Sequence, residues 1–223
     1  YFDPKTDYAP TTAISSISWD DPNFPNIEGF GVWAAKCNFT MGPDGKMYSR
    51  MLGGNLVRID VENARGENLT NGDLVGTKDG SAYGLVFDPQ DENVFYFSNN
   101  DKHCIYKYDL RTKECACWAG QEGKSGYLDG PIGQAMFNKP GQMCVDSEGN
   151  IILTDTENHC IRKITMSTGY VSTLAGKPQN SGYVNGSAED AQFKKPLGIC
   201  IDNDDVMYIG DSENRAIRRL AVE

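Results

Sequence analysis

Apolar and polar residues alternate in short stretches along most of the chain, and turn-forming residues separate these stretches. The pattern is clearest from Lys139, where KPGQMCVDSEGNIILTDTENHCIRKI contains three such stretches broken by Asp, Gly and Asn. Alternation with a period of two residues is typical of β-strands that bury one face. No stretch combines a 3.6-residue apolar period with capping residues, so we expect very little helix.

The same stretch occurs again from Lys195, as KPLGICIDNDDVMYIGDSENRAIRRL. Corresponding residues, such as Asp155 and Asp211, are 56 positions apart. Two weaker copies precede them, FTMGPDGKMYSRMLGGNLVRID and YGLVFDPQDENVFYFSNNDKHCIYKYD, and the second is followed by TKECACWAG. A fixed period of this length indicates a repeat architecture in which every copy forms the same structural unit.

Each complete unit contains four short strands, and a lone four-stranded sheet cannot bury both of its faces. Antiparallel sheets of this size in series are typical of a β-propeller. We therefore predict an all-β fold, a β-propeller built from four-stranded antiparallel blades. The chain is expected to form a single domain over residues 1–223, with repeats at about 30–80, 81–137, 138–193 and 194–223.

Residues 1–29 are irregular and rich in proline, but they contain one alternating stretch, TAISSISW at 12–19. This stretch resembles TGYVSTLAG at 168–176, the last strand of the third repeat. The fourth repeat stops after its third strand, so residues 12–19 could complete that blade and close a small ring. Alternatively, the chain is a piece of a larger ring.

The stretches GNIILTDTENHCIRKI and VSTLAG, together with the linker GYVNGSAEDAQFKKP, resemble NHL repeats, the units of six-bladed, TolB-like propellers. The linker also occurs as GYLDGPIGQAMFNKP. The resemblance covers about residues 30–223 and implies that the four readable repeats are part of a six-bladed ring. It also implies a bacterial surface or secreted protein, and hence a secreted, periplasmic or cell-surface location.

The composition narrows the choice of partners. The chain has 31 acidic and 21 basic residues and a net charge of −10, which argues against nucleic acid because phosphate binding needs a basic patch. No apolar run is long enough to span a bilayer, and no signal peptide opens the chain. The seven cysteines follow neither a metal-binding nor a disulfide spacing, so we expect free structural thiols.

Propeller geometry indicates where a binding site would lie. The turns between second and third strands share one face with the long linkers between blades, which we call the loop-rich face, and such loops usually carry function. Residues of these turns offer mixed charge and hydrogen-bonding groups that suit a protein, peptide or carbohydrate ligand. The ligand-binding candidates are Asn55, Lys102, His103, Asn158, His159, Asn214 and Arg215. This pattern favours a non-catalytic binding propeller.

A metal site is the alternative. His103 and His159 are the only histidines and occupy the same repeat position, so they could share a divalent metal such as zinc. Asp155 and Asp211 could instead contribute oxygen ligands to calcium, although their recurrence favours a role in fixing the turns. A third zinc ligand is not identifiable, and no G-x-S-x-G or H-E-x-x-H motif occurs. This reading predicts a metal-dependent hydrolase or lyase acting at the central mouth of the loop-rich face.

Other recurring side chains favour structural roles. Tyr127 and Tyr183 in the linkers either stack on a ligand or pin the linker to its blade, and their recurrence favours pinning. Phe137 and Phe193 are expected to pack between blades. The basic residues of the third strands are expected to face solvent because exposure alternates along a strand: Arg162, Lys163, Arg218 and Arg219.

Overall fold

The computed structural model describes residues 39–50, 56–60, 65–70 and 83–221. Within these ranges the chain forms four antiparallel sheets and two single-turn 3-10 helices, with no α-helix. The first sheet has the order β1 (Thr40–Met41), β2 (Met47–Arg50), β3 (Leu56–Asp60), β4 (Arg65–Asn68). The second has the order β5 (Leu85–Phe87), β6 (Val94–Asn99), β7 (Cys104–Asp109), β8 (Cys115–Gly120).

The third and fourth sheets follow the same order. The third consists of β10 (Pro140–Val145), β11 (Ile151–Asp155), β12 (Cys160–Thr165) and β13 (Tyr170–Ala175), and β9 (Gly130–Pro131) pairs with the outer edge of β13. The fourth consists of β14 (Pro196–Ile201), β15 (Met207–Asp211) and β16 (Ala216–Leu220). The 3-10 turns η2 (Thr156–Asn158) and η3 (Ser212–Asn214) join second strands to third strands in these two sheets.

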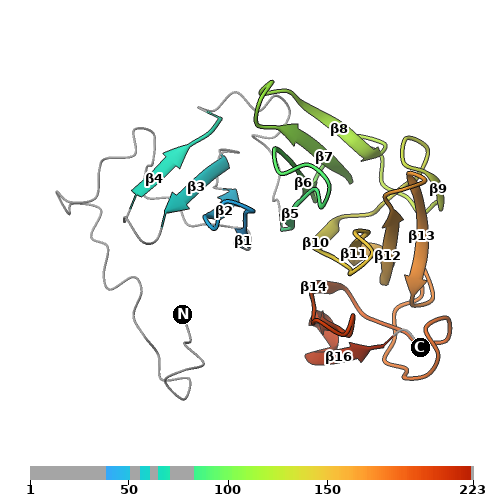
Figure 1. Ribbon diagram of the computed structural model, residues 1–223. Coiled ribbons are helices and arrows are strands. Elements are labelled where there is room, and N and C mark those ends of the chain that lie inside the picture. The colour runs from blue at the N-terminus through green and yellow to red at the C-terminus, as the bar shows by residue number, and fades with distance from the viewer. Residues whose placement is uncertain (1–38, 51–55, 61–64, 71–82, 222–223) are drawn as a thin grey trace, which may run out of the picture.

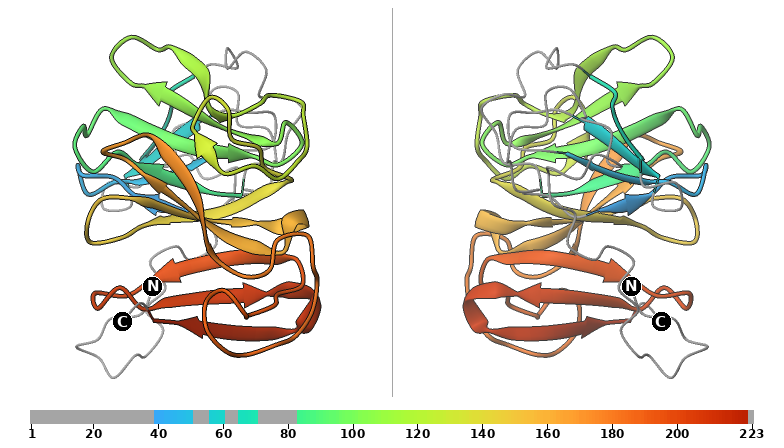
Figure 2. Two further views of the ribbon diagram at one scale, coloured as in Figure 1. Left: turned by 90° about the vertical axis from the view of Figure 1, so that its right-hand side faces the viewer. Right: turned by 90° about the vertical axis from the view of Figure 1, so that its left-hand side faces the viewer.

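The four sheets lie in an arc, with the first strand of each, β1, β5, β10 and β14, turned toward a common centre (Figure 1). Figure 2 shows the third and fourth sheets stacked one against the other. This is the arrangement of propeller blades, and the predicted all-β fold of four-stranded antiparallel units is confirmed.

The hydrophobic core is divided into layers between neighbouring sheets. One cluster, which includes Tyr48 and Phe95, joins the first sheet to the second. The next joins the second to the third around Phe137, and the last joins the third to the fourth around Phe193. Both linker phenylalanines are therefore buried between blades, as predicted. Each sheet has to be covered by a neighbour because a single sheet has no core of its own.

An aspartate follows the first strand of the second, third and fourth sheets and shapes the turn after it. Asp88, Asp146 and Asp202 each accept a backbone N–H bond from within the next turn, at 2.9, 2.7 and 2.9 Å. In the third sheet, Gly149 completes the turn with a φ of 82°, a conformation that glycine adopts without strain.

Some predictions lie outside the described residues, including the strand at 12–19 and Asn55. The six-blade count and the repeat boundaries stay predictions. The cysteines of the described ranges are free thiols, of which Cys104 and Cys160 are buried and Cys200 is exposed. No helix in the described part of the chain is long and apolar enough to cross a membrane.

Candidate functional site

Arg162 and Arg218 of the third strands are buried, which corrects the expectation that they face solvent. Arg162 has a relative exposure of 0% and Arg218 of 8%. Their neighbours in sequence, Lys163 and Arg219, are more accessible. Exposure therefore alternates along each strand. The arginine side chain lies on the buried face because a carboxylate there forms an ion pair with it.

Arg162 is held by an ion pair and by the linker that precedes its own sheet. Its Nη1 donates to Asp155 Oδ2 at 2.7 Å, and its Nη2 donates to Asp129 Oδ1 at 2.6 Å. The same two nitrogens also donate to the carbonyl oxygens of Met136 and Leu128. A guanidinium suits this position because its five N–H donors lie in one plane and can bind several acceptors at once.

Asp155 fixes the other side of this network. Its Oδ1 accepts the backbone N–H of Asn138 at 2.8 Å, and its Oδ2 accepts Nδ2 of Asn158 at 2.8 Å as well as Arg162. Burial raises the pKa of the Asp155 carboxyl to about 6, and Arg162 opposes that shift. Both oxygens are thus occupied by the fold, in agreement with the structural role that recurrence favoured.

The fourth sheet repeats the network residue for residue. Arg218 Nη1 donates to Asp211 Oδ2 at 2.9 Å, and Nη2 donates to Asn185 Oδ1 at 2.6 Å. Asp211 also accepts the backbone N–H of Lys194 and Nδ2 of Asn214. The candidates Asn158 and Asn214 each donate a second bond from Nδ2 to a linker carbonyl oxygen, those of Gly126 and Gly182.

Two aromatic rings enclose each arginine. The Cζ atom of Arg162 lies 4.8 Å from the ring centroid of Tyr127 and 5.2 Å from that of Phe137. Arg218 lies 4.9 Å from Tyr183 and 5.0 Å from Phe193. A guanidinium over an aromatic face is stabilised by the ring quadrupole. The tyrosines therefore contact the arginine of the sheet that follows, which is the pinning role that the sequence favoured.

The histidine candidates occupy a strained backbone position at the end of each turn. His103, His159 and Arg215 have φ values of 55°, 59° and 52°, in the left-handed region. The backbone N–H of His159 and of Arg215 bonds to the first residue of the preceding 3-10 turn. This conformation is uncommon for residues other than glycine, although histidine, asparagine and aspartate adopt it more often than most.

Each histidine bonds to the blade that follows it. The backbone N–H of Lys139 donates to Nδ1 of His103 at 3.1 Å, and that of Lys195 donates to Nδ1 of His159 at 3.2 Å. Because Nδ1 accepts a bond, the neutral ring carries its proton on Nε2. Burial and the charge of Lys139 lower the pKa of His103. The two histidines are therefore joints between neighbouring blades.

Lysine and glutamate side chains surround these joints. Lys195 Nζ lies 3.3 Å from Glu157 and 3.1 Å from Glu213, so it links the turns of the third and fourth sheets. Lys102 lies 3.8 Å from Glu122. Arg215 is exposed. The described part of this face therefore offers exposed groups of both signs.

The described residues do not gather three or more His, Cys, Asp or Glu side chains where they could hold a metal ion. The two histidines use Nδ1 for the backbone, and the two aspartates use both carboxylate oxygens within their own networks. Zinc or calcium binding stays a prediction that rests on the sequence.

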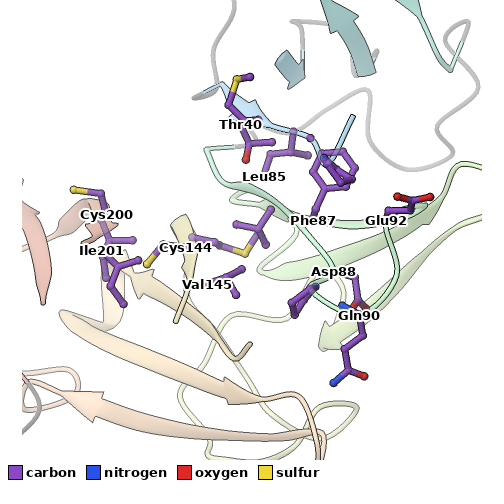
Figure 3. Close-up of a pocket in the computed structure, with 17 residues that line it drawn as sticks. Thr40, Leu85, Phe87, Asp88, Gln90, Glu92, Cys144, Val145, Cys200 and Ile201 are labelled. Atoms are coloured by element: carbon purple, nitrogen blue, oxygen red, sulfur yellow. The ribbon is translucent and has the colours of Figure 1, made fainter. Parts of the chain in front are cut away.

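A pocket lies at the other end of the inner strands, and none of the predicted candidates lines it. It has a volume of about 880 Å³ and is formed where the first strands of all four sheets end. Figure 3 shows side chains from each sheet around this space, including Thr40, Phe87, Val145 and Ile201. The sequence did not indicate the pocket, because its walls are inner-strand residues and nearby turn residues from four sheets that are far apart in the chain.

The chain shares its repeat and fold with known proteins. A sequence model of the NHL repeat family, described as "NHL repeat", matches residues 137–164. A chicken (Gallus gallus) protein named NHL repeat-containing protein 2 is 30% identical over 152 residues, which cover 67% of this chain and 19% of that protein. The chain therefore spans about a fifth of the length of this relative.

Solved structures share the same arrangement of sheets. A protein of unknown function from Bacteroides thetaiotaomicron has a TM-score of 0.76 and 28% identity, over 83% of this chain and 46% of that one. An auxiliary nutrient binding protein from the same organism has a TM-score of 0.67 and 28% identity, over 82% and 46%. A streptogramin B lyase, at 16% identity and a TM-score of 0.56, shares the fold alone. The chain thus carries an NHL repeat within a β-propeller fold.

Proposed function

We propose that this chain is a non-catalytic binding propeller that recognises a protein, peptide or glycan. The observation that carries the proposal is how the recurring polar groups are used. Asp155, Asp211, Asn158 and Asn214 are committed to bonds within a blade, and the histidines bond between blades. What remains accessible near them, in the described ranges, is a set of hydrogen-bonding and charged groups.

The similar proteins support this proposal only in part. One solved structure of similar fold is described as a nutrient binding protein, and another as a lyase. We further propose that the four sheets belong to a six-bladed ring in a secreted, periplasmic or cell-surface protein, as the NHL resemblance implies. No membrane-spanning helix occurs in the described ranges.

The loop-rich face is tested with peptide and glycan arrays probed by the full chain, followed by calorimetry on the strongest hit. The variant Lys102→Ala/Arg215→Ala removes two accessible cations from that face. We expect it to lose about tenfold in affinity, since hot-spot arginines contribute 1–2 kcal/mol or more.

The matched control is Lys107→Ala/Arg219→Ala, which removes the same charge from strand positions away from that face. An equal loss in both variants would show that net charge alone is responsible. A chain that binds nothing on either array would overturn the proposed function.

The alternative is a metal-dependent hydrolase or lyase that uses His103 and His159. It is motivated by their shared turn position. Because Nδ1 of each ring accepts a backbone N–H and Nε2 carries the proton, zinc binding would require Nδ1 to give up that bond. Elemental analysis of freshly purified protein, with His103→Gln/His159→Gln as control, tests it. Stoichiometric zinc that is lost in the double variant would favour the alternative over a simple binding protein.

A further inference from the structure

The pocket at the turn end of the inner strands is lined by apolar side chains together with polar and acidic ones. Its lining includes Met41, Leu85, Phe87, Met143, Val145 and Ile201. Side chains from all four sheets reach this space, so it lies on the central axis of the arc (Figure 3). A volume of about 880 Å³ is within the usual range for ligand pockets, which is roughly 300 to 1,000 Å³.

Acidic residues surround the mouth of this pocket. The turns after the first strands, at 42–46, 88–93, 146–150 and 202–206, contain nine acidic residues and one basic residue. Asp88 and Glu92 are themselves part of the lining. These turns therefore carry an excess of acidic residues, whereas the described part of the loop-rich face carries both signs.

Part of this acidic charge is not neutralised. Asp44, Asp91 and Asp146 form ion pairs with Arg58, Arg111 and Lys163. The ion pairs of the described ranges do not include Asp88, Glu92, Asp204 or Asp205, whereas the charge of Arg219 helps to lower the pKa of Asp202. Asp88 accepts the hydroxyl of Tyr96 at 2.7 Å, which positions it without cancelling its charge. Carboxylates that lack a neighbouring cation concentrate a negative potential at the mouth of the pocket.

We propose that this mouth binds a basic peptide segment, one in which lysine or arginine alternates with apolar residues. The apolar side chains would enter the pocket, while the cations would meet Asp88 and Glu92 at its edge. An acidic glycan or a nucleic acid would be repelled by the same carboxylates. The inference rests on the proposed binding function and names its ligand, but it moves the site from the loop-rich face to the opposite face.

The experiment measures fluorescence anisotropy of the labelled peptide Gly-Lys-Leu-Gly-Lys-Leu-Gly with the full chain. The comparison peptide carries glutamate in place of each lysine. We expect binding of the lysine peptide only, with an affinity that falls as salt rises from 0.05 to 0.3 M, because that range shortens the Debye length. The variant Asp88→Asn/Glu92→Gln should bind about fivefold more weakly, since exposed ion pairs contribute up to about 1 kcal/mol each.

Two controls make the result specific. Glu122→Gln/Glu189→Gln removes the same charge from the linkers and should leave the affinity unchanged. Cys200→Trp places a large ring in the exposed wall of the pocket and should abolish binding by filling it. Equal weakening by both charge variants, or full binding by Cys200→Trp, would overturn the site.

The peptide-binding result can be distinguished from the result of the array experiment. If the arrays detect a ligand that depends on Lys102 and Arg215 while the lysine peptide fails to bind, this inference is wrong and the proposed function stands. If the lysine peptide binds with the expected variant pattern, the proposed function is supported through this pocket.

Discussion

The third and fourth sheets have the same polar network but a different apolar surface. Arg162 and Arg218 make matching bonds to an aspartate, two linker carbonyls and a linker side chain. Ile161 and Ile217, the preceding residue in each strand, have exposures of 0% and 80%. Ile161 packs in the cluster between the third and fourth sheets, whereas no further sheet covers Ile217 within the described ranges. The polar network therefore joins one sheet to the linker that precedes it, while the core needs two neighbouring sheets.

The second sheet shows how the network can be replaced. Its residue at the arginine position is Tyr106, and its residue at the aspartate position is Asn99. The acid and the base are thus absent together, which avoids leaving one buried charge without the other. Tyr106 packs in the aromatic cluster between the first and second sheets, where its ring lies 5.4 Å from that of Phe97.

The largest effect is expected from breaking one arginine network. Arg162→Ala leaves Asp155 buried without its cation, and we expect a loss of about 3–5 kcal/mol in the free energy of unfolding. Arg218→Ala should cost less, because Arg218 is slightly exposed and has one carboxylate partner where Arg162 has two. Urea unfolding of the full chain measures both. Arg162→Lys should not rescue stability, since an ammonium cannot serve four acceptors in one plane; full rescue would contradict the role of the fork geometry.

The isoleucine pair tests the difference between the sheets. Ile161→Ala should cost about 2–4 kcal/mol, because it opens a cavity in a closed layer. Ile217→Ala should change stability by less than about 0.5 kcal/mol, as expected of an exposed position. The same urea experiment compares them. A large effect at Ile217 would indicate that another part of the chain covers it in solution.

The linker partners should give a smaller effect. Asp129, in the linker before the third sheet, corresponds to Asn185, in the linker before the fourth, and each accepts a bond from an arginine Nη2 at 2.6 Å. Asp129→Asn should cost about 1 kcal/mol or less, because Asp129 is partly exposed and the amide oxygen can still accept the bond. Asn185→Asp is the reciprocal change and should be neutral or slightly stabilising. If Asp129→Asn instead raised the free energy of unfolding and Asn185→Asp lowered it, the second carboxylate would not stabilise the buried arginine.

The smallest effect is expected from the joint at His103. Its pKa in the folded chain is lowered by burial and by Lys139, so the unfolded chain takes up the proton first. Stability from this residue is present above about pH 6.5 and is lost as pH falls toward the lower folded pKa. Nitrogen-15 NMR titration gives the folded pKa, and urea midpoints at pH 7.5 and 5.5 give the slope. His103→Gln should reduce that slope, and an unchanged slope would exclude His103 as its source.

The repeat period was sufficient to predict the fold, because strand alternation and turn residues recur in every copy. It was also sufficient to assign Asp155 and Asp211 to structure, since a residue that recurs with a repeat maintains the repeat. The burial of Arg162 was not predicted, although the sequence contains a signal for it. Arginine is present where aspartate occurs seven residues earlier, in the third and fourth repeats, and both are absent from the second.

The pocket could not be predicted for a different reason. Its lining comes from inner strands that are more than 150 residues apart, from Thr40 to Ile201. The lining residues that belong to strands look like core when each is read along its own strand. Only the curvature of the arc decides which of these side chains border a cavity, and curvature depends on packing between sheets rather than on any local pattern.

The bonds between each buried arginine and the preceding linker determine where the chain could be divided into modules. The linker at 126–137 is bound by Arg162 and Asn158 of the sheet that follows it, and β9 within that linker pairs with β13 of the same sheet. A module that could be duplicated, deleted or transplanted intact would therefore start near Gly120 or Gly176, ahead of its linker, and not at Lys139 or Lys195. Recombination at the linker start would carry each guanidinium together with every group that binds it.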